Sequence, residues 1–329
     1  MRARHVVMAG LLAGAVIGLV RAARPKARFP QVGGGLPVTV TTSDGVRLAV
    51  DVSAPEAPEY AVVFAHGWVL NRHSWHFQRE ALDGEAMLVL YDQRGHGSSS
   101  AGPYESCTIE QLGDDLYAVI EAVVPPGLPV ILVGHSMGGM TIMGLAAGHP
   151  ELFGDRVVGV ALLSTSAGDL ASNTFGLPKG VVSRLTPVVL DGMLARAAQL
   201  DRRVALKART NLPVTRYVAF GRKPDSSHVR FVNDMIAATP TEVMVGFFHG
   251  ILAHDKLAVL GALSAVETVV IVGERDRLTT PSHARRIAAA VPGARLVVVP
   301  EAGHMVGMER PEVVNRALSE LAARAVVPA

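Results

Sequence analysis

The sequence has one cysteine and few charged residues, and each shortage excludes a class of protein. The single Cys107 excludes an internal disulfide framework and any zinc or iron–sulfur site that needs several cysteines. Charged residues make up 18% of the 329 residues and hydrophobic residues 49%, which excludes an intrinsically disordered chain. Glycine and proline follow no fixed period, which excludes a collagen-like fibre. What remains is a globular protein with a sizeable core.

Acidic residues are missing from the amino-terminal end. Residues 1–28 hold six basic side chains and no acid, so the rest of the chain has 25 basic residues against 29 acidic ones. A mildly acidic body lacks the clustered basic surface that neutralises nucleic-acid phosphates. We therefore expect no nucleic-acid partner.

The amino-terminal apolar run is short for a membrane span. Residues 6–20 are uncharged, but a spanning helix needs roughly 17–25 residues. Flanking arginines could extend the run by snorkelling. A cleaved signal peptide fits the length and the basic start, yet no small-residue cleavage site separates the run from the arginines that follow. We predict membrane association through residues 6–20, with secretion after cleavage as the alternative and a buried core helix as the least favoured interpretation.

The basic residues around this run predict its orientation. Two precede it and four follow it. The side richer in lysine and arginine stays cytoplasmic, where it also meets anionic headgroups of the inner leaflet. Residues 1–30 are therefore expected to form an anchor and basic linker, with the body in the cytoplasm.

After a linker rich in glycine and proline, short apolar runs alternate with helix-length segments. Ser43-Asp44-Gly45 separates the first two runs and predicts a hairpin. The later runs are rich in β-branched residues and predict strands buried on both faces of a parallel sheet: 60–65, 87–91, 130–133, 157–163, 268–272 and 295–299. This alternation predicts an α/β fold with a mostly parallel central sheet covered by helices.

Residues 169–240 interrupt the alternation. They contain five prolines and helical stretches but no convincing strand pattern. We expect a helical lid inserted between two parts of an α/β core, residues 31–168 and 241–329.

The strongest chemical signal is Gly134-His135-Ser136-Met137-Gly138, which lies between a predicted strand and a predicted helix. In this context a Gly-x-Ser-x-Gly sequence forms a sharp turn that lifts the serine above the sheet edge. The turn also places the Met137 amide at a helix N-terminus, where partial positive charge favours an oxyanion.

A second oxyanion donor is expected after the strand at 60–65. His66-Gly67-Trp68 follows that strand directly, and the Trp68 backbone amide would serve as the donor. For the His66 side chain we favour a structural role, with the imidazole tied to the backbone.

A candidate acid and base follow two later strands. Asp276 comes after the run at 268–272, and His304 comes after the run at 295–299. A serine hydroxyl needs a base within hydrogen-bond reach, and the imidazole needs a carboxylate that fixes its tautomer. Asp169 and Glu274 are the rival acids. None of the eleven other histidines competes well with His304 as base: His249 and His254 lie in a helical pattern, and His283 comes just after Pro281.

Together these motifs resemble the α/β-hydrolase superfamily over about residues 38–325. The segments that carry the resemblance are HGW at 66–68, YDQRGHGSS at 91–99, GHSMGG at 134–139, GERDRLTTP at 273–281 and GHM at 303–305. They look most like lidded esterases, monoacylglycerol lipases and cofactor-free haloperoxidase-like perhydrolases. The resemblance implies an acyl-enzyme on Ser136, hydrolysed by a water that His304 activates. It also implies that Asp92 and Arg94 belong to a structural loop.

The apolar character of the predicted lid favours an acyl substrate, because such a lid lines the pocket and excludes water. The leading hypothesis is a serine carboxylesterase or lipase for lipid-like or small acyl esters. One alternative is a perhydrolase, in which peroxide replaces water. Another is a non-catalytic ligand-binding protein, which the presence of all three candidate residues disfavours. We expect no cofactor and no metal site, since His73 and His76 lack an obvious third ligand.

Overall fold

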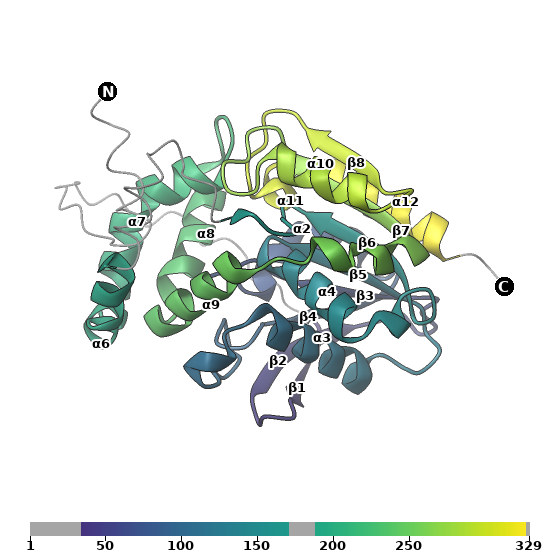
Figure 1. Cartoon of the computed structure of the whole chain (residues 1–329), viewed down its shortest axis with the longest axis horizontal. Coiled ribbons are helices and arrows are strands. Elements are labelled where there is room, and N and C mark those ends of the chain that lie inside the picture. Colours follow the sequence, from purple (N-terminus) through teal and green to yellow (C-terminus); the bar gives the residue numbers. More distant parts are fainter. Residues whose placement is uncertain (1–33, 171–187, 327–329) are drawn as a thin grey trace.

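Eight strands form one sheet in the computed structural model, which describes residues 34–170 and 188–326. Their order is β1-β2-β4-β3-β5-β6-β7-β8. Antiparallel pairing joins β1 (Leu36–Thr41) to β2 (Arg47–Ser53) and β2 to β4 (Met87–Tyr91). The others pair in parallel: β3 (Ala61–Ala65), β5 (Val130–His135), β6 (Val157–Leu163), β7 (Glu267–Gly273) and β8 (Arg295–Val299). The predicted hairpin and mostly parallel sheet are confirmed (Figure 1).

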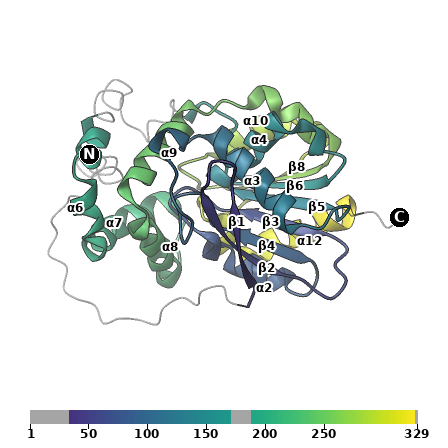
Figure 2. The ribbon, with the colours of Figure 1, turned by 90° about the horizontal axis from the view of Figure 1, so that it is seen from below.

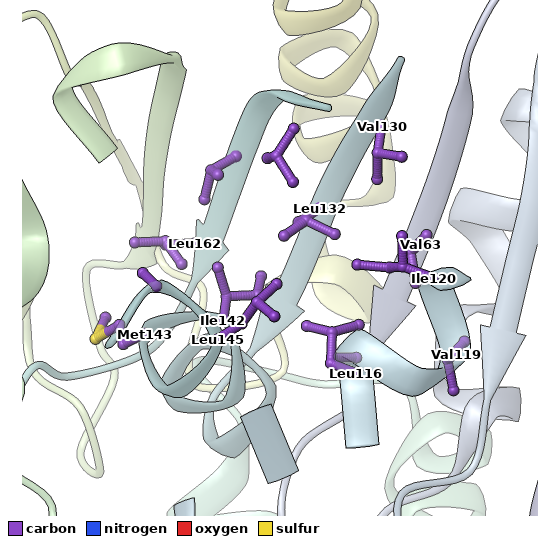
Figure 3. Packing of buried hydrophobic residues seen from close by; sticks show 14 of the residues in the cluster. Val63, Leu116, Val119, Ile120, Val130, Leu132, Ile142, Met143, Leu145 and Leu162 are labelled. Carbon is purple, nitrogen blue, oxygen red and sulfur yellow. The ribbon is translucent and has the colours of Figure 1, made fainter. Parts of the chain in front are cut away.

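Helices cover both faces of the sheet. One face carries α3 (Ile109–Val123), α4 (Met137–Gly148) and α10 (Pro281–Ala290), and the other carries α2 (His76–Leu82) and α12 (Pro311–Ala325). The sequence of strand β3 is a continuous apolar run because both faces of the strand are buried. Val63 packs with the first set of helices and Phe64 with the second, because successive side chains of a strand point to opposite faces. In Figure 3, Val63 and Leu132 of the sheet face Leu116 of α3 and Ile142 of α4.

Helix α3 illustrates how local sequence sets the bounds of an element. The Thr108 hydroxyl caps it by accepting the Gln111 amide at 3.1 Å. Leu116, Val119 and Ile120 lie at helical spacing and are fully buried against the sheet, and Leu112 is buried against α4 and α9. The helix ends before Pro125, which disfavours helical geometry in the residue before it.

The expectation that every strand is buried on both faces is wrong for β8. This strand lies at the edge of the described sheet, where it pairs with β7 alone, and it is largely half-buried, with Val298 36% exposed. Its β-branched composition resembles that of the central strands, so composition alone did not reveal the edge position.

A group of helices gathers at one end of the molecule (Figures 1 and 2). They are α6 (Ala197–Asp201), α7 (Val204–Ala219), α8 (Ser226–Ala238) and α9 (Thr241–Ala253). The expected membrane run at 6–20 and the first part of the expected lid, residues 171–187, lie outside the described residues. The described chain also contains shorter elements: η1 (Arg72–Trp75), η2 (Tyr104–Ser106), η3 (Pro150–Leu152), η5 (Leu257–Ala265) and α11 (Val306–Glu309).

Across residues 34–170 and 188–326, no single helix has both the length and the apolar character of a membrane span. Helices α8 and α9 pass that test only as a pair, and a 100° bend separates them.

Candidate active site

Ser136 occupies a sharp turn between β5 and α4. Its backbone has φ 54° and ψ −117°, a conformation that serine rarely adopts. Hydrogen bonds on both sides hold the residue there. The Ser136 amide donates to the Leu163 carbonyl at 2.9 Å, and the Thr165 hydroxyl donates to the Ser136 carbonyl at 2.7 Å. The structure therefore places Ser136 in a turn between a strand and a helix, as the sequence predicted.

Gly138 allows helix α4 to approach the end of β3 closely. A Cβ at this position would collide with the carbonyl of Ala65. Because no side chain intervenes, the first turn of α4 lies against the loop that follows β3. Met137 at the start of α4 and Trp68 in that loop consequently come from neighbouring segments.

His304 and Asp276 are hydrogen-bonded to each other. Nδ1 of His304 lies 2.9 Å from Oδ2 of Asp276, and both residues are buried. The backbone amides of Leu278 and Thr279 donate to Oδ1 of Asp276 at 2.8 and 3.0 Å. Burial alone would raise the pKa of Asp276, but the His304 charge and these hydrogen bonds outweigh it and lower the pKa. The carboxylate is thus held charged and aimed at the imidazole.

The loops after β7 and β8 come together because Gly273 lacks a side chain. A Cβ there would collide with the carbonyl oxygens of Ala302 and Gly303. Backbone bonds join the two loops: the Glu274 amide donates to Val299 at 2.9 Å, and the Arg275 amide donates to Ala302 at 2.8 Å. This contact places the predicted acid beside the predicted base.

Ser136 and His304 line the same cavity of about 100 Å³. No hydrogen bond joins these two described side chains, and such contacts are often longer in an empty site than in a substrate complex. The remaining lining of the described chain is mostly apolar and carries no Lys, Arg, Asp or Glu. It comes from 67–70, from α7, α8 and α9, and from the loops beside His304: Gly67, Trp68, Val69, Leu70, His135, Asn211, Val214, Thr215, Val218, Ala219, Val232, Ile236, Met244, Leu278 and Met305.

The Trp68 side chain ties the loop after β3 to helix α9. Its indole Nε1 donates to the Met244 carbonyl at 3.1 Å, and its ring lies 5.5 Å from that of Phe248. Within the described chain, the backbone amides of Trp68 and Met137 donate to no protein acceptor. Both expected donors therefore remain open at the cavity end of the sheet.

The rival candidates lie elsewhere. Asp169 is exposed and pairs with Arg286 at 4.0 Å, and Glu274 accepts the backbone amide of Glu301 at 3.1 Å. The other weighed histidines have their own contacts: His249 with the Tyr104 hydroxyl, His254 with the Ser166 carbonyl and His283 with the Thr280 hydroxyl.

His66 and the loop that contains Asp92 and Arg94 make the kind of structural contacts that the sequence predicted for them. The His66 imidazole lies 2.8 Å from the Gly67 carbonyl and accepts the Gln93 amide at 2.9 Å. Asp92 accepts the Arg72 amide at 2.8 Å, and Arg94 is ion-paired with Asp44 and Asp115, for example at 2.6 Å to Asp115. All of these bonds are made to other groups of the protein.

Sequence reasoning missed two polar residues that touch the acid–base pair. The Thr279 hydroxyl donates to Oδ2 of Asp276 at 3.0 Å. The His135 imidazole donates through Nε2 to the His304 carbonyl at 2.9 Å, and burial, followed by the neighbouring His304, lowers the pKa of His135 to about 3. The only sequence signal was proximity, since Thr279 follows Asp276 by three residues and His135 precedes Ser136.

No group of three or more His, Cys, Asp or Glu residues in the described ranges is arranged to hold a metal ion.

Comparisons with known proteins agree on one family. A sequence model described as "Alpha/beta hydrolase family" matches residues 62–317. The chain is 26% identical to 3-oxoadipate enol-lactonase 2 of Acinetobacter baylyi, over 82% of this chain and 91% of that protein. It is 25% identical to the bifunctional esterase/perhydrolase DCH of Acinetobacter calcoaceticus, over 85% and 97%. A thermophilic esterase from Thermogutta terrifontis is similar in structure, with a TM-score of 0.70, 26% identity and coverage of 89% and 100%.

Proposed function

The chain belongs to the alpha/beta hydrolase family, and from that premise we propose that it is a serine hydrolase that cleaves carboxylic esters through an acyl-enzyme on Ser136. The relatives support a hydrolase that acts on esters. The observation that carries the finer proposal is the buried Asp276–His304 hydrogen bond beside the cavity that Ser136 also lines.

The proposed reaction divides its steps among these residues. Ser136 Oγ attacks the ester carbonyl while His304 Nε2 takes its proton, and His304 then returns that proton to the leaving alcohol. Asp276 keeps the hydrogen on Nδ1 of His304, so that Nε2 faces the cavity with a lone pair. The Trp68 and Met137 amides stabilise the oxyanion that forms on the carbonyl oxygen. Water activated by His304 next cleaves the acyl-enzyme.

The cavity lining favours an uncharged substrate. Its described walls are mostly valine, leucine, methionine and similar side chains, without a cationic group. A carboxylate buried against such walls would lose its hydration without gaining a partner. We therefore infer a neutral acyl ester, lipid-like or small, as the substrate class.

Helices α7, α8 and α9 supply one wall of this cavity. This placement supports the proposal that the insertion predicted at residues 169–240 covers the site as a lid. Helix α9 begins at Thr241, where the second part of the core was expected to begin, and β7 follows at Glu267. A cover over the acyl-enzyme would limit access of bulk water.

A perhydrolase reaction is the second candidate, because one relative is named a bifunctional esterase/perhydrolase. Hydrogen peroxide would then replace water as the nucleophile that cleaves the acyl-enzyme, and the same residues would serve. Adding peroxide to an ester assay separates the two reactions, because only perhydrolysis yields a peracid. Accumulation of peracid faster than that of free acid would make perhydrolysis the main activity.

A panel of p-nitrophenyl esters tests the substrate class. We expect neutral acyl esters to be hydrolysed at least about 100-fold more efficiently, in kcat/KM, than esters of equal length that end in a carboxylate, because the carboxylate would be buried unpaired. The matched pairs share chain length and leaving group, so only the charge differs. Equal rates for both series would contradict the inferred substrate class.

We further propose that the amino-terminal run at residues 6–20 associates the enzyme with a membrane, with the hydrolase domain cytoplasmic. The run's composition and its flanking arginines support this proposal. Deletion of residues 1–28 should move the protein from the membrane fraction to the supernatant without changing kcat on a water-soluble ester, because Ser136, Asp276 and His304 all lie in the body. Protease added to intact cells checks the orientation. A mature protein in the medium that begins near residue 24 would instead identify a signal peptide.

A further inference from the structure

The loop that carries the Trp68 amide is a tight turn in an unfavourable conformation. The Leu70 amide donates to the Gly67 carbonyl at 3.2 Å, which closes a four-residue turn. Val69, the third residue, has φ 56°. That position in a type II turn needs a positive φ and is normally glycine, whereas a residue with a Cβ is disfavoured there by roughly 1–2 kcal/mol. Contacts from outside the turn must therefore hold it.

His96 supplies such a contact. Its Nδ1 lies 3.0 Å from the Arg94 carbonyl oxygen, and since that oxygen can only accept, Nδ1 carries the hydrogen. Nε2 then has a free lone pair and accepts the Val69 amide at 3.2 Å. His96 is fully buried, and burial, followed by the nearby His66, lowers its pKa to about 3. The imidazole thus stays neutral and able to accept.

The loop that contains His96 also reaches the other expected donor. Gln93 donates through Nε2 to the His66 carbonyl at 2.6 Å, and its Oε1 accepts the Thr141 hydroxyl at 2.6 Å. Thr141 lies one turn after Met137 in α4 and is 3.0 Å from the Met137 carbonyl. Side chains of residues 92–98 therefore contact both backbone segments that flank the proposed oxyanion hole.

We propose that His96 is a positioning residue of the oxyanion hole: by accepting the Val69 amide, it holds the turn at 67–70 so that the Trp68 amide points at the substrate carbonyl oxygen. This inference rests on the proposed ester hydrolysis at Ser136. It assigns a role to the histidine of the RGHG sequence, which touches neither the substrate cavity nor the acid–base pair.

Replacing His96 by phenylalanine tests the role. The variant removes the acceptor but keeps an aromatic ring, which in the native protein lies 5.3 Å from His66 and 5.5 Å from Phe247. Complete loss of one oxyanion donor lowers kcat by about 10²–10³-fold, so a displaced donor should lower it by about 10–100-fold. KM should change by less than about 3-fold, because the donor acts mainly on the transition state.

Two further measurements separate positioning from general damage. The affinity of a boronic acid, which forms a tetrahedral anion on Ser136, should weaken in parallel with kcat. His96→Gln should keep most of the activity because its amide oxygen can accept the Val69 amide, whereas the shorter His96→Asn should lose it. If His96→Phe does not fold, the comparison of His96→Gln with His96→Asn still tests the role of His96.

A double-variant cycle with Val69→Gly gives the sharpest test. Glycine adopts the positive φ without strain, so the turn should need His96 less. We expect the kcat loss caused by His96→Phe to shrink at least about 3-fold in the Val69→Gly background, although loss of the buried valine side chain lowers stability. An equal loss in both backgrounds, or unchanged boronate affinity, would overturn the role of His96. If Ser136→Ala retained activity, the proposed function would fail instead, so the two failures are distinguishable.

Discussion

Replacing Ser136 by alanine is expected to abolish ester hydrolysis while the protein stays folded. The variant removes the proposed nucleophile, and no hydrogen bond within the described part of the chain depends on the Ser136 hydroxyl. The hydrogen bonds that hold the turn use the backbone atoms of Ser136 and not its hydroxyl, so the free energy of unfolding should change by less than about 1 kcal/mol. Activity on a neutral p-nitrophenyl ester and a denaturant melt measure the two effects.

Ser264→Ala is the matched control for this variant. Ser264 is exposed in η5, just before β7, and lies outside the Ser136 cavity. Its replacement should leave kcat unchanged. Turnover by Ser136→Ala at a rate close to that of the control would show that the acyl-enzyme forms elsewhere or that the reaction needs none.

Replacing Asp276 by asparagine is expected to lower kcat by roughly 10⁴-fold. The amide nitrogen of asparagine would face Nδ1 of His304 and favour the tautomer that carries hydrogen on Nε2, the wrong nitrogen for accepting the Ser136 proton. The backbone amides of Leu278 and Thr279 can still donate to the remaining oxygen, so the loop should keep its conformation. Steady-state kinetics at a fixed neutral pH measures the loss.

Asp169→Asn is the control for the acid, because Asp169 is an exposed carboxylate that pairs with Arg286. We expect this variant to keep nearly all of its activity. A large loss from Asp169→Asn, with Asp276→Asn nearly silent, would reverse the assignment of the acid.

The central strands and the turn at Ser136 could be predicted from sequence because their causes are local. A continuous apolar run such as 157–163 predicts a strand that is buried on both faces of a sheet, and β6 has the same bounds. The glycines around Ser136 indicated the strand–turn–helix because backbone atoms approach there too closely for a Cβ. The edge position of β8 depends instead on which strand lies next to it, and that is a property of the whole sheet.

Contacts between distant segments were not predictable from a single sequence. His135 donates to the carbonyl of a residue 169 positions away, and Trp68 donates to the carbonyl of Met244 in α9. Such pairs depend on how segments far apart in the sequence come together around the site, and no periodicity encodes that arrangement. His96 belongs to the same class: its motif indicated a structural loop, but only the fold shows that the loop touches the turn beside Trp68.

Labelling with an organophosphonate ester tests the central claim most directly. The reagent reacts with an activated serine and leaves a stable adduct that peptide mass spectrometry locates. We expect stoichiometric labelling at Ser136 in the native protein, strongly slowed labelling in Asp276→Asn and no labelling in Ser136→Ala. A stoichiometric adduct on any other residue, or an active protein in which Ser136 stays unlabelled, would contradict the acyl-enzyme on Ser136.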